Sequence, residues 1–208
     1  MQYEEKYLKY KHKYLNLKKQ NGGSNIIIHI AGTQGSGKTT LGERLVSKYG
    51  DKIFVYDLDN LRNEYISDKN KYDNYQDFLY KFINNHYSKP LILVGLDAEM
   101  CLGEMKDSDK YYDLKANIKL YIKSSNQTLK QRFFRQLDKL DKRKEWFFEN
   151  WLKNPESIQE KIFRFVDLNK WKENNEKCDR LYGSRGYVSM TSNEIFEYID
   201  KILDNKNL

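Results

Sequence analysis

Short apolar runs alternate along this chain with longer segments in which apolar and polar residues are mixed. Compact runs rich in β-branched and other apolar residues predict strands at residues 26–31, 52–56, 90–97, 116–123 and 186–190. The first and third runs are mostly apolar, which is typical of a strand buried on both faces. Strands separated by helical segments predict an α/β domain.

The segments between these runs carry apolar residues at the spacing of one helix face. The pattern over residues 40–49 predicts a helix, and Gly50 is placed to end it. Residues 63–89 are polar and tyrosine-rich, and their apolar positions at 78–83 also have helical spacing. Thr191 and Glu194 have the spacing of a capping box. They introduce a closing helix with an apolar face made of Ile195, Tyr198, Ile199, Ile202 and Leu203.

Residues 1–20 form a separate basic segment at the start of the chain. Its tyrosines recur in steps of three and four among lysines, which predicts an amphipathic leader helix. Residues 21–24 read Asn-Gly-Gly-Ser and predict a linker to a domain that covers residues 25–208. A solvated or loosely docked helix and a docking or address segment both fit this pattern.

The composition limits the class of protein. The formal net charge is +7, but six lysines and two glutamates within residues 1–20 supply +4 of it, so basicity alone does not indicate nucleic acid. Cys101 and Cys178 lack metal-ligand spacing and are typical of reduced thiols in an intracellular protein. Since no apolar run approaches membrane-spanning length, we expect a soluble, cytoplasmic protein with no membrane partner.

A glycine-rich segment follows the first strand and opens the first helix. It matches the G-x-x-x-x-G-K-[ST] phosphate-binding loop at every fixed position, and strand, loop and helix occur in the order that this motif requires. Glycines let successive backbone N–H groups point at phosphate oxygens, and the helix start adds its positive dipole end. The residues expected to bind a nucleoside triphosphate are Gly32, Thr33, Gln34, Gly35, Ser36, Gly37, Lys38, Thr39 and Thr40.

Two residues of this loop have side chains with specific roles. Lys38 is expected to reach the β- and γ-phosphates as a point charge and to act in catalysis. Thr39 offers its hydroxyl to Mg²⁺. The motif therefore predicts that ATP and Mg²⁺ are the cofactors.

Acidic residues follow the second and third predicted strands, at the edge where open α/β sheets bind ligands. One of Asp57 and Asp59 is expected to act on an acceptor hydroxyl, and the other to hold the Mg²⁺ shell through water. The alternative is that one of them caps the following helix. Asp97 ends the third strand and is a candidate to orient magnesium-bound water, with Glu99 as a nearby substitute.

The region after the fourth strand is basic and aromatic. Arg132 and Arg135 lie three residues apart on a predicted helix, so they share a face. Such a pair neutralises charge on a transferred phosphoryl group, although ordinary surface arginines have the same pattern. Residues 138–180 predict a helical insertion, with aromatic residues that favour packing over base stacking.

Together, the loop at 32–40, the Asp57-Leu58-Asp59 sequence and the arginine helix resemble P-loop kinases of the nucleoside and nucleoside-monophosphate kinase type. The resemblance implies a three-layer fold with a five-stranded parallel sheet flanked by helices, and a lid that carries arginines. It assigns Asp59 to the acceptor hydroxyl, and Arg132 and Arg135 to the lid. Asp59 and Arg62 also resemble the Asp-x-x-Arg of polynucleotide 5′-hydroxyl kinases, in which the arginine touches an acceptor phosphate. Asp57 and Asp59 equally resemble shikimate- and gluconate-type kinases.

The sequence therefore predicts an enzyme that transfers a phosphoryl group from ATP to a small-molecule, nucleoside or nucleotide acceptor. Asp57, Asp59 and Arg62 are the expected acceptor-binding residues, and Thr39 and Asp97 the expected metal-binding residues. A polynucleotide 5′-hydroxyl kinase and a non-catalytic nucleotide-binding virion or scaffold protein are the alternatives. The leader resembles a segment found at the start of giant-virus proteins, which implies docking to a viral partner or to a second copy.

Overall fold

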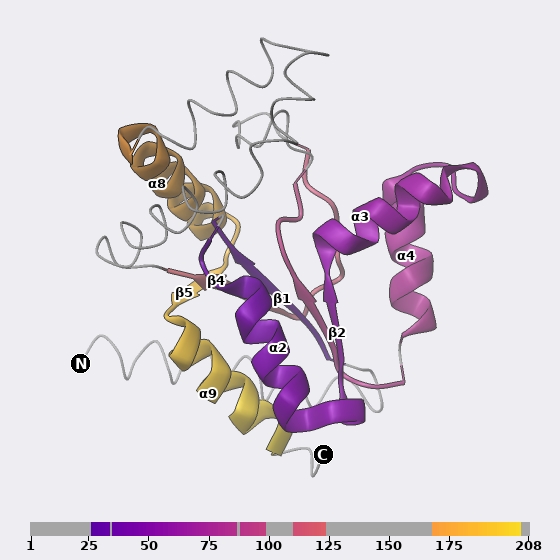
Figure 1. Cartoon of the computed structure of the whole chain (residues 1–208), viewed down its shortest axis with the longest axis horizontal. Helices are drawn as coiled ribbons and strands as arrows, with labels where there is room; N and C mark the ends of the chain where they lie inside the picture. The colour runs from indigo at the N-terminus through magenta and orange to yellow at the C-terminus, as the bar shows by residue number, and fades with distance from the viewer. Residues whose placement is uncertain (1–25, 34, 87, 99–109, 124–167, 205–208) are drawn as a thin grey trace, which may run out of the picture.

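The chain folds around one parallel β-sheet with helices on both faces (Figure 1). The structure is a computed structural model that describes residues 26–33, 35–86, 88–98, 110–123 and 168–204. Its strands are β1 (Ile27–Gly32), β2 (Phe54–Asp57), β3 (Leu91–Val94), β4 (Ile118–Ile122) and β5 (Val188–Met190). They lie in the order β2-β3-β1-β4-β5, and every neighbouring pair is parallel. The five-stranded sheet expected from the sequence is confirmed.

Burial follows the strand pattern. β1 and β3 occupy the interior of the sheet and are buried along their whole length, whereas β2 lies at one edge and is half-buried throughout. Successive side chains of β1 point to opposite faces, so Ile28 and Ile30 join one core cluster, and Ile27 and Ala31 join clusters on the other face. The sheet is therefore the middle of three layers.

The first helical layer consists of α2 (Lys38–Tyr49) and α9 (Ser192–Asp204), which lie side by side on one face (Figure 1). Gly50 ends α2 as expected, with a φ of 55° and its amide bonded to the Val46 carbonyl. Gly42 allows α2 to approach the sheet closely, because a Cβ there would lie 3.2 Å from Val55. Gly42 and Leu45 are buried, whereas the neighbouring apolar residue Val46 is 46% exposed.

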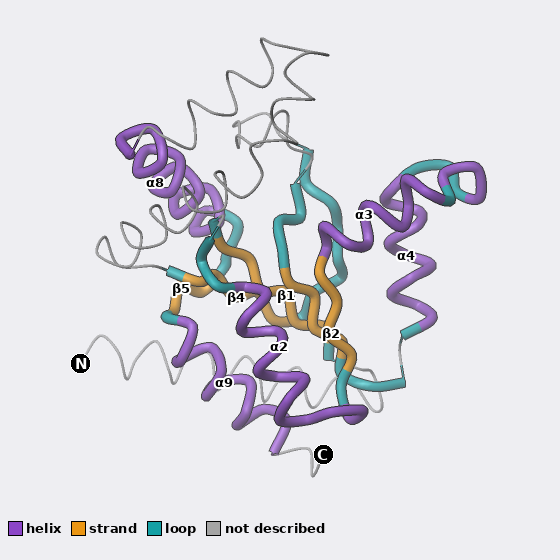
Figure 2. The backbone as a smooth tube through the Cα atoms, in the orientation of Figure 1, coloured by secondary structure: helices purple, strands orange, loops and turns teal. Residues whose placement is uncertain are grey.

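The second helical layer covers the opposite face with α3 (Leu58–Ser67), α4 (Tyr75–Asn85) and α8 (Leu168–Ser184). In the tube view, α3 and α4 lie over the β2 end of the sheet and α8 over the β5 end (Figure 2). Short 3₁₀ turns at Gly50–Lys52 and Lys69–Lys71 complete the regular structure of the described residues. The helices expected within residues 63–89 correspond to the end of α3 and to α4.

Several sequence-based predictions lie outside the described residues. They are the leader at 1–20, the linker at 21–24, and residues 138–167 of the expected insertion. Residues 168–180 belong to α8, which continues past the expected boundary to Ser184. Its buried Cys178 and Tyr182 pack against Ala31 and Tyr121, so this end of the helix is part of the core.

Candidate functional site

The glycine-rich loop turns tightly between β1 and α2. The Ser36 amide donates to the Thr33 carbonyl at 3.0 Å, and Gly35 and Gly37 have φ values of 73° and 93°. Gly32 is required by a close contact, because a Cβ there would lie 2.5 Å from the Ser36 hydroxyl oxygen. That hydroxyl is fully buried and has no hydrogen-bond partner among the described residues. The loop therefore has the wrapped form that the motif predicts.

The N-terminus of α2 lacks the side-chain cap found on its neighbours. Its N-cap residue is Gly37, which has no side chain to make a cap hydrogen bond, and its first turn holds no acidic residue. By contrast, Asp57 caps α3, Asn74 caps α4, and Thr191 caps α9. The orphan amides of a helix start and its positive dipole end form a site for an anion. This end of α2 is therefore suited to a phosphate group.

Lys38 lies in the first turn of α2 and bends back over the loop. Its ammonium donates to the Gly32 carbonyl at 2.8 Å and to the Thr33 carbonyl at 2.9 Å. These contacts hold the positive charge at the loop, although the side chain is only partly buried. The ammonium therefore lies at the loop, beside the uncapped helix start, and its contact with phosphates stays a prediction.

Asp57 links the second strand to the phosphate loop. One carboxylate oxygen accepts from the Asp59 amide at 2.9 Å and caps α3. The other accepts from the Thr39 hydroxyl at 3.3 Å. The sequence left open whether an acid here caps the helix or belongs to the site. The Asp57 carboxylate caps α3 and at the same time contacts Thr39 of the loop. Of the two acids, Asp57 is therefore the one that lies against the hydroxyl expected to bind magnesium.

Asp59 and Arg62 lie one helical turn apart at the start of α3. The Asp59 side chain is 75% exposed, and its carboxylate lies 3.8 Å from the Arg62 guanidinium. Arg62 also donates to the Ala98 carbonyl at 3.1 Å, which fixes its position against the turn after β3. The pair therefore places a solvent-facing carboxylate, and an arginine fixed by its hydrogen bond to Ala98, next to Asp57.

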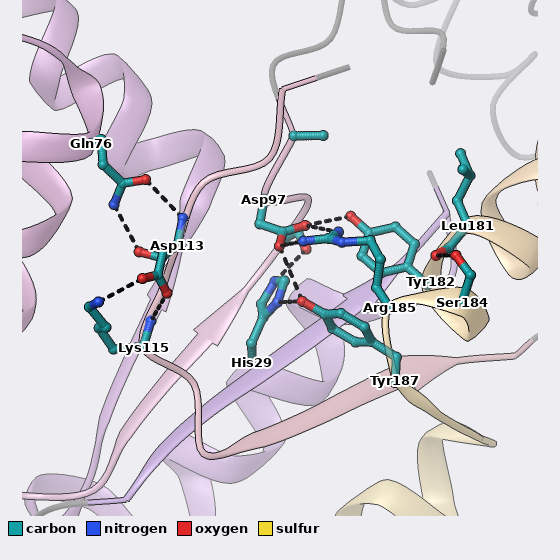
Figure 3. A network of polar contacts seen from close by, with 12 residues as sticks. His29, Gln76, Asp97, Asp113, Lys115, Leu181, Tyr182, Ser184, Arg185 and Tyr187 are labelled. Carbon is teal, nitrogen blue, oxygen red and sulfur yellow. Dashed lines mark hydrogen bonds and ion pairs between the residues drawn. The ribbon is translucent and has the colours of Figure 1, made fainter. Parts of the chain in front are cut away.

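Asp97 lies in the turn after β3 and is almost fully buried, at 3% exposure. Two Arg185 nitrogens donate to it at 3.0 and 2.6 Å, the Tyr182 hydroxyl donates at 2.9 Å, and the Tyr187 hydroxyl oxygen lies 3.1 Å from its Oδ2 (Figure 3). Burial alone would raise the pKa of Asp97, but the Arg185 hydrogen bonds, the neighbouring positive charge and the Tyr182 hydroxyl lower it. The metal role expected for Asp97 stays a prediction that these contacts do not favour, because both oxygens already have donors.

His29 lies in the middle of β1 and joins the same group of side chains. Its Nδ1 is 2.7 Å from the Tyr187 hydroxyl, and its Nε2 is 3.0 Å from the Gly95 carbonyl (Figure 3). Burial lowers the pKa of His29 to about 4, although the Asp97 charge opposes this effect. Neither His29 nor Arg185 was among the residues expected at the site. The only signal for His29 was one polar residue inside an apolar strand.

A family model described as an AAA domain matches residues 28–164, which is more than half of the chain. The chain belongs to this AAA domain family. The matched part begins in β1 and includes the whole phosphate loop, the acids at the start of α3 and Asp97. No curated protein matches the chain.

The AAA domain match and the fold agree on a P-loop domain of the nucleotide-binding type.

Four of the expected site residues, Gln34, Glu99, Arg132 and Arg135, lie outside the described residues, so the structure does not place them. In the described part of the chain, no three His, Cys, Asp or Glu side chains are grouped to hold a metal ion. Among the same residues, no helix is both long enough and apolar enough to cross a membrane.

Proposed function

We propose that this AAA domain protein is a P-loop kinase that transfers a phosphoryl group from ATP, with Mg²⁺, to a small-molecule, nucleoside or nucleotide acceptor. The contact between the Thr39 hydroxyl and the Asp57 carboxylate, beside the uncapped start of α2, carries the proposal. It brings together a hydroxyl, a carboxylate and the backbone amides of a helix start, which are the groups that bind magnesium and phosphate. The family also includes P-loop kinases.

The described residues fit a nucleotide with its magnesium ion. Mg²⁺ at such sites is bound by one or two protein oxygens, together with waters and substrate phosphates, so a cluster of several acids is not needed. Thr39 and Asp57 would hold the ion, which would supply positive charge to the phosphate oxygens. Lys38 and the first amides of α2 would hold the phosphates, with the buried Ser36 hydroxyl lining the same loop.

Asp59 is proposed as the residue that accepts the proton of the acceptor hydroxyl. Asp59 lies in the first turn of α3, the helix that Asp57 caps. Its carboxylate is exposed to solvent, so an incoming hydroxyl has access to it. Arg62 is proposed to orient the acceptor. Arg132 and Arg135 stay proposed contacts of the transferring phosphoryl group.

A polynucleotide 5′-hydroxyl kinase is the second candidate, and the held position of Arg62 favours it. The guanidinium lies 3.8 Å from the Asp59 carboxylate and donates to the Ala98 carbonyl, so it sits beside the proposed base. An arginine in this place would bind a phosphate next to the reacting hydroxyl. Steep weakening of acceptor binding with salt would indicate a nucleic-acid end, because binding to a polyanion releases counterions.

The decisive experiment is an acceptor screen with γ-labelled ATP that includes metabolites, nucleosides, nucleotides and oligonucleotides with free 5′ hydroxyls. With an acceptor found, Lys38→Ala is expected to lower turnover by about 10²-fold or more, because it removes a charge from the phosphate site. Asp59→Asn is expected to lower turnover by about 10²-fold while ATP affinity is retained. Lys52→Ala and Asp73→Asn change exposed residues outside the site and serve as controls.

Two results would contradict the proposal. Near-wild-type turnover by Lys38→Ala with a verified acceptor would refute the assignment of the phosphate site. Tight ATP binding with no acceptor labelled in the whole screen would favour a nucleotide-binding protein without catalytic activity.

A further inference from the structure

A buried polar cluster around Asp97 lies next to the residues proposed to bind the nucleotide and the acceptor. Asp97 comes from the turn after β3 and His29 from β1, Tyr182 lies in the last turn of α8, and Arg185 and Tyr187 lie between α8 and β5 (Figure 3). His29 and Tyr182 are completely buried, and Asp97 almost so. The cluster therefore ties the end of α8 to two interior strands.

The hydrogen bonds of this cluster fix which atom holds each proton. The Gly95 carbonyl can only accept, so the proton of a neutral His29 is on Nε2. Nδ1 must then accept, and the Tyr187 hydroxyl at 2.7 Å is its donor. Since a hydroxyl has one proton, Asp97 depends mainly on Arg185 and Tyr182. The bidentate contact with Arg185 is thus the main support of this buried carboxylate.

The turn held by this cluster also contacts the start of α3. Gly95 has a φ of 136°, and a Cβ there would lie 2.9 Å from the Leu58 Cβ. Leu58 stands between Asp57 and Asp59. At the other end of the turn, the Ala98 carbonyl accepts from Arg62. The turn Gly95–Ala98 therefore contacts the segment that carries Asp57, Asp59 and Arg62.

Arg185 has a second contact with the same region. Its guanidinium lies 3.6 Å from the centre of the Tyr111 ring, and Tyr111 forms a β-bridge with Ala98. The arginine therefore binds one residue of the turn directly and a second one through Tyr111. Two contacts from one rigid guanidinium restrict both the position and the orientation of the turn.

We propose that the Asp97–Arg185 pair is a clasp that positions the turn Gly95–Ala98, and through it Asp57, Asp59 and Arg62, for the reaction. Asp97 is then a positioning residue and not a ligand of magnesium. The inference rests on the proposed function for its effect on turnover. Its effect on the arrangement of α3 does not depend on that function. A buried ion pair contributes little net stability compared with apolar side chains of similar size, so its geometry is the property that matters here.

The test compares Asp97→Asn, Arg185→Lys and the double variant with the wild-type protein. The first readout is amide hydrogen exchange at Asp59, whose amide donates to Asp57, and at Tyr112, whose amide donates to the Asp97 carbonyl at 2.7 Å. We expect exchange at both amides to rise by about fivefold or more in each single variant, and the double variant to add little. Amides of β1 are expected to stay protected. Asp200→Asn, which removes the partner of Lys48 on the other face of the sheet, is the matched control and is expected to leave both amides unchanged.

The second readout is the binding of a fluorescent ATP analogue as a function of Mg²⁺ concentration. A positioning role predicts that Asp97→Asn changes the half-saturating Mg²⁺ concentration by less than about twofold. With an acceptor in hand, kcat or the KM for the acceptor is expected to change by about tenfold or more in this variant. Arg185→Lys keeps the charge but loses the bidentate contact, and is expected to restore only part of the activity that Arg185→Gln loses.

Three results would overturn the inference. They are a tenfold increase in the Mg²⁺ requirement of Asp97→Asn, unchanged exchange at Asp59 in all variants, and additive effects of the two substitutions. Amide hydrogen exchange and Mg²⁺-dependent binding of the ATP analogue can be measured without an acceptor. A failed acceptor screen would therefore count against the proposed kinase, whereas these two measurements would still test the positioning role of the Asp97–Arg185 pair.

Discussion

The burial of His29 in β1 allows a quantitative prediction of how the free energy of unfolding changes at acid pH. His29 is completely buried, and its burial lowers the pKa from 6.5 to about 4. Between these two pH values the unfolded chain binds a proton that the folded protein does not. Stability therefore falls as the pH drops through this window, and the loss is complete only below about pH 4. At about 1.4 kcal/mol for each pH unit, the expected total loss is roughly 3 kcal/mol.

This loss is a large share of the roughly 5–15 kcal/mol that stabilises a typical domain. Carboxylates that are stabilised in the folded protein act in a different window. The pKa of Asp97 is lowered, so its contribution is present above the unfolded value of about 3.9 and is lost only below it. The interval from pH 6.5 to 4.5 therefore isolates the contribution of His29 from that of its buried partner.

The assay is urea unfolding, followed by circular dichroism, at several pH values from 8 to 4.5. The wild-type free energy of unfolding is expected to fall steeply below pH 6.5, whereas His29→Gln, which cannot titrate, is expected to lose most of this dependence. His86→Gln leaves His29 in place and is the matched control that keeps the steep fall. A wild-type loss below about 1 kcal/mol between pH 7 and 4.5, or an equal slope in His29→Gln, would refute the reasoning. Imidazole NMR shifts that show a protonated His29 at pH 5.5 would do the same.

Two further predictions concern single contacts. Gly32→Ala places a Cβ 2.5 Å from the Ser36 oxygen, so ATP affinity measured by titration calorimetry is expected to fall by at least about tenfold, whereas Gly183→Ala has no neighbour within 4 Å and is expected to bind normally. Equal affinities would contradict the role of Gly32. Thr191→Ala removes one arm of the capping box, in which Thr191 and Glu194 bond each other's amides at 3.3 and 2.8 Å. Urea unfolding is expected to show a loss of about 1 kcal/mol, and an unchanged midpoint would refute that estimate.

The sequence was most informative where neighbouring residues decide the structure. The five apolar runs became the five strands, although all ends but one moved by one to three residues; Lys52, for example, ends a 3₁₀ turn and does not begin β2. The phosphate loop was recognisable because a short motif contains all of its constraints. The capping box at Thr191 and the stop at Gly50 were predictable for the same reason.

What the sequence did not reveal depends on contacts between distant residues. Asp97 and Arg185 are 88 positions apart, and His29 and Tyr187 are 158 apart, so no local pattern connects them. Asp97 was chosen for its place at a strand end, and that place alone cannot show that an arginine just after α8 binds it. The choice between Asp57 as a helix cap and as a site residue was left open because one side chain makes both contacts.

The strand order has a consequence for how the nucleotide site assembles during folding. The loop that follows β1 and the acids that follow β2 lie within one short stretch of chain, yet these two strands are not neighbours. β3, formed by later residues, separates them and pairs with both. A nascent chain that ended before Leu91 would hold the loop and its carboxylates but lack the strand that sets their spacing. Nucleotide binding by this domain is thus expected to require the pairing of β3 with β1 and β2. It would therefore depend on the completed sheet and not on the motif alone.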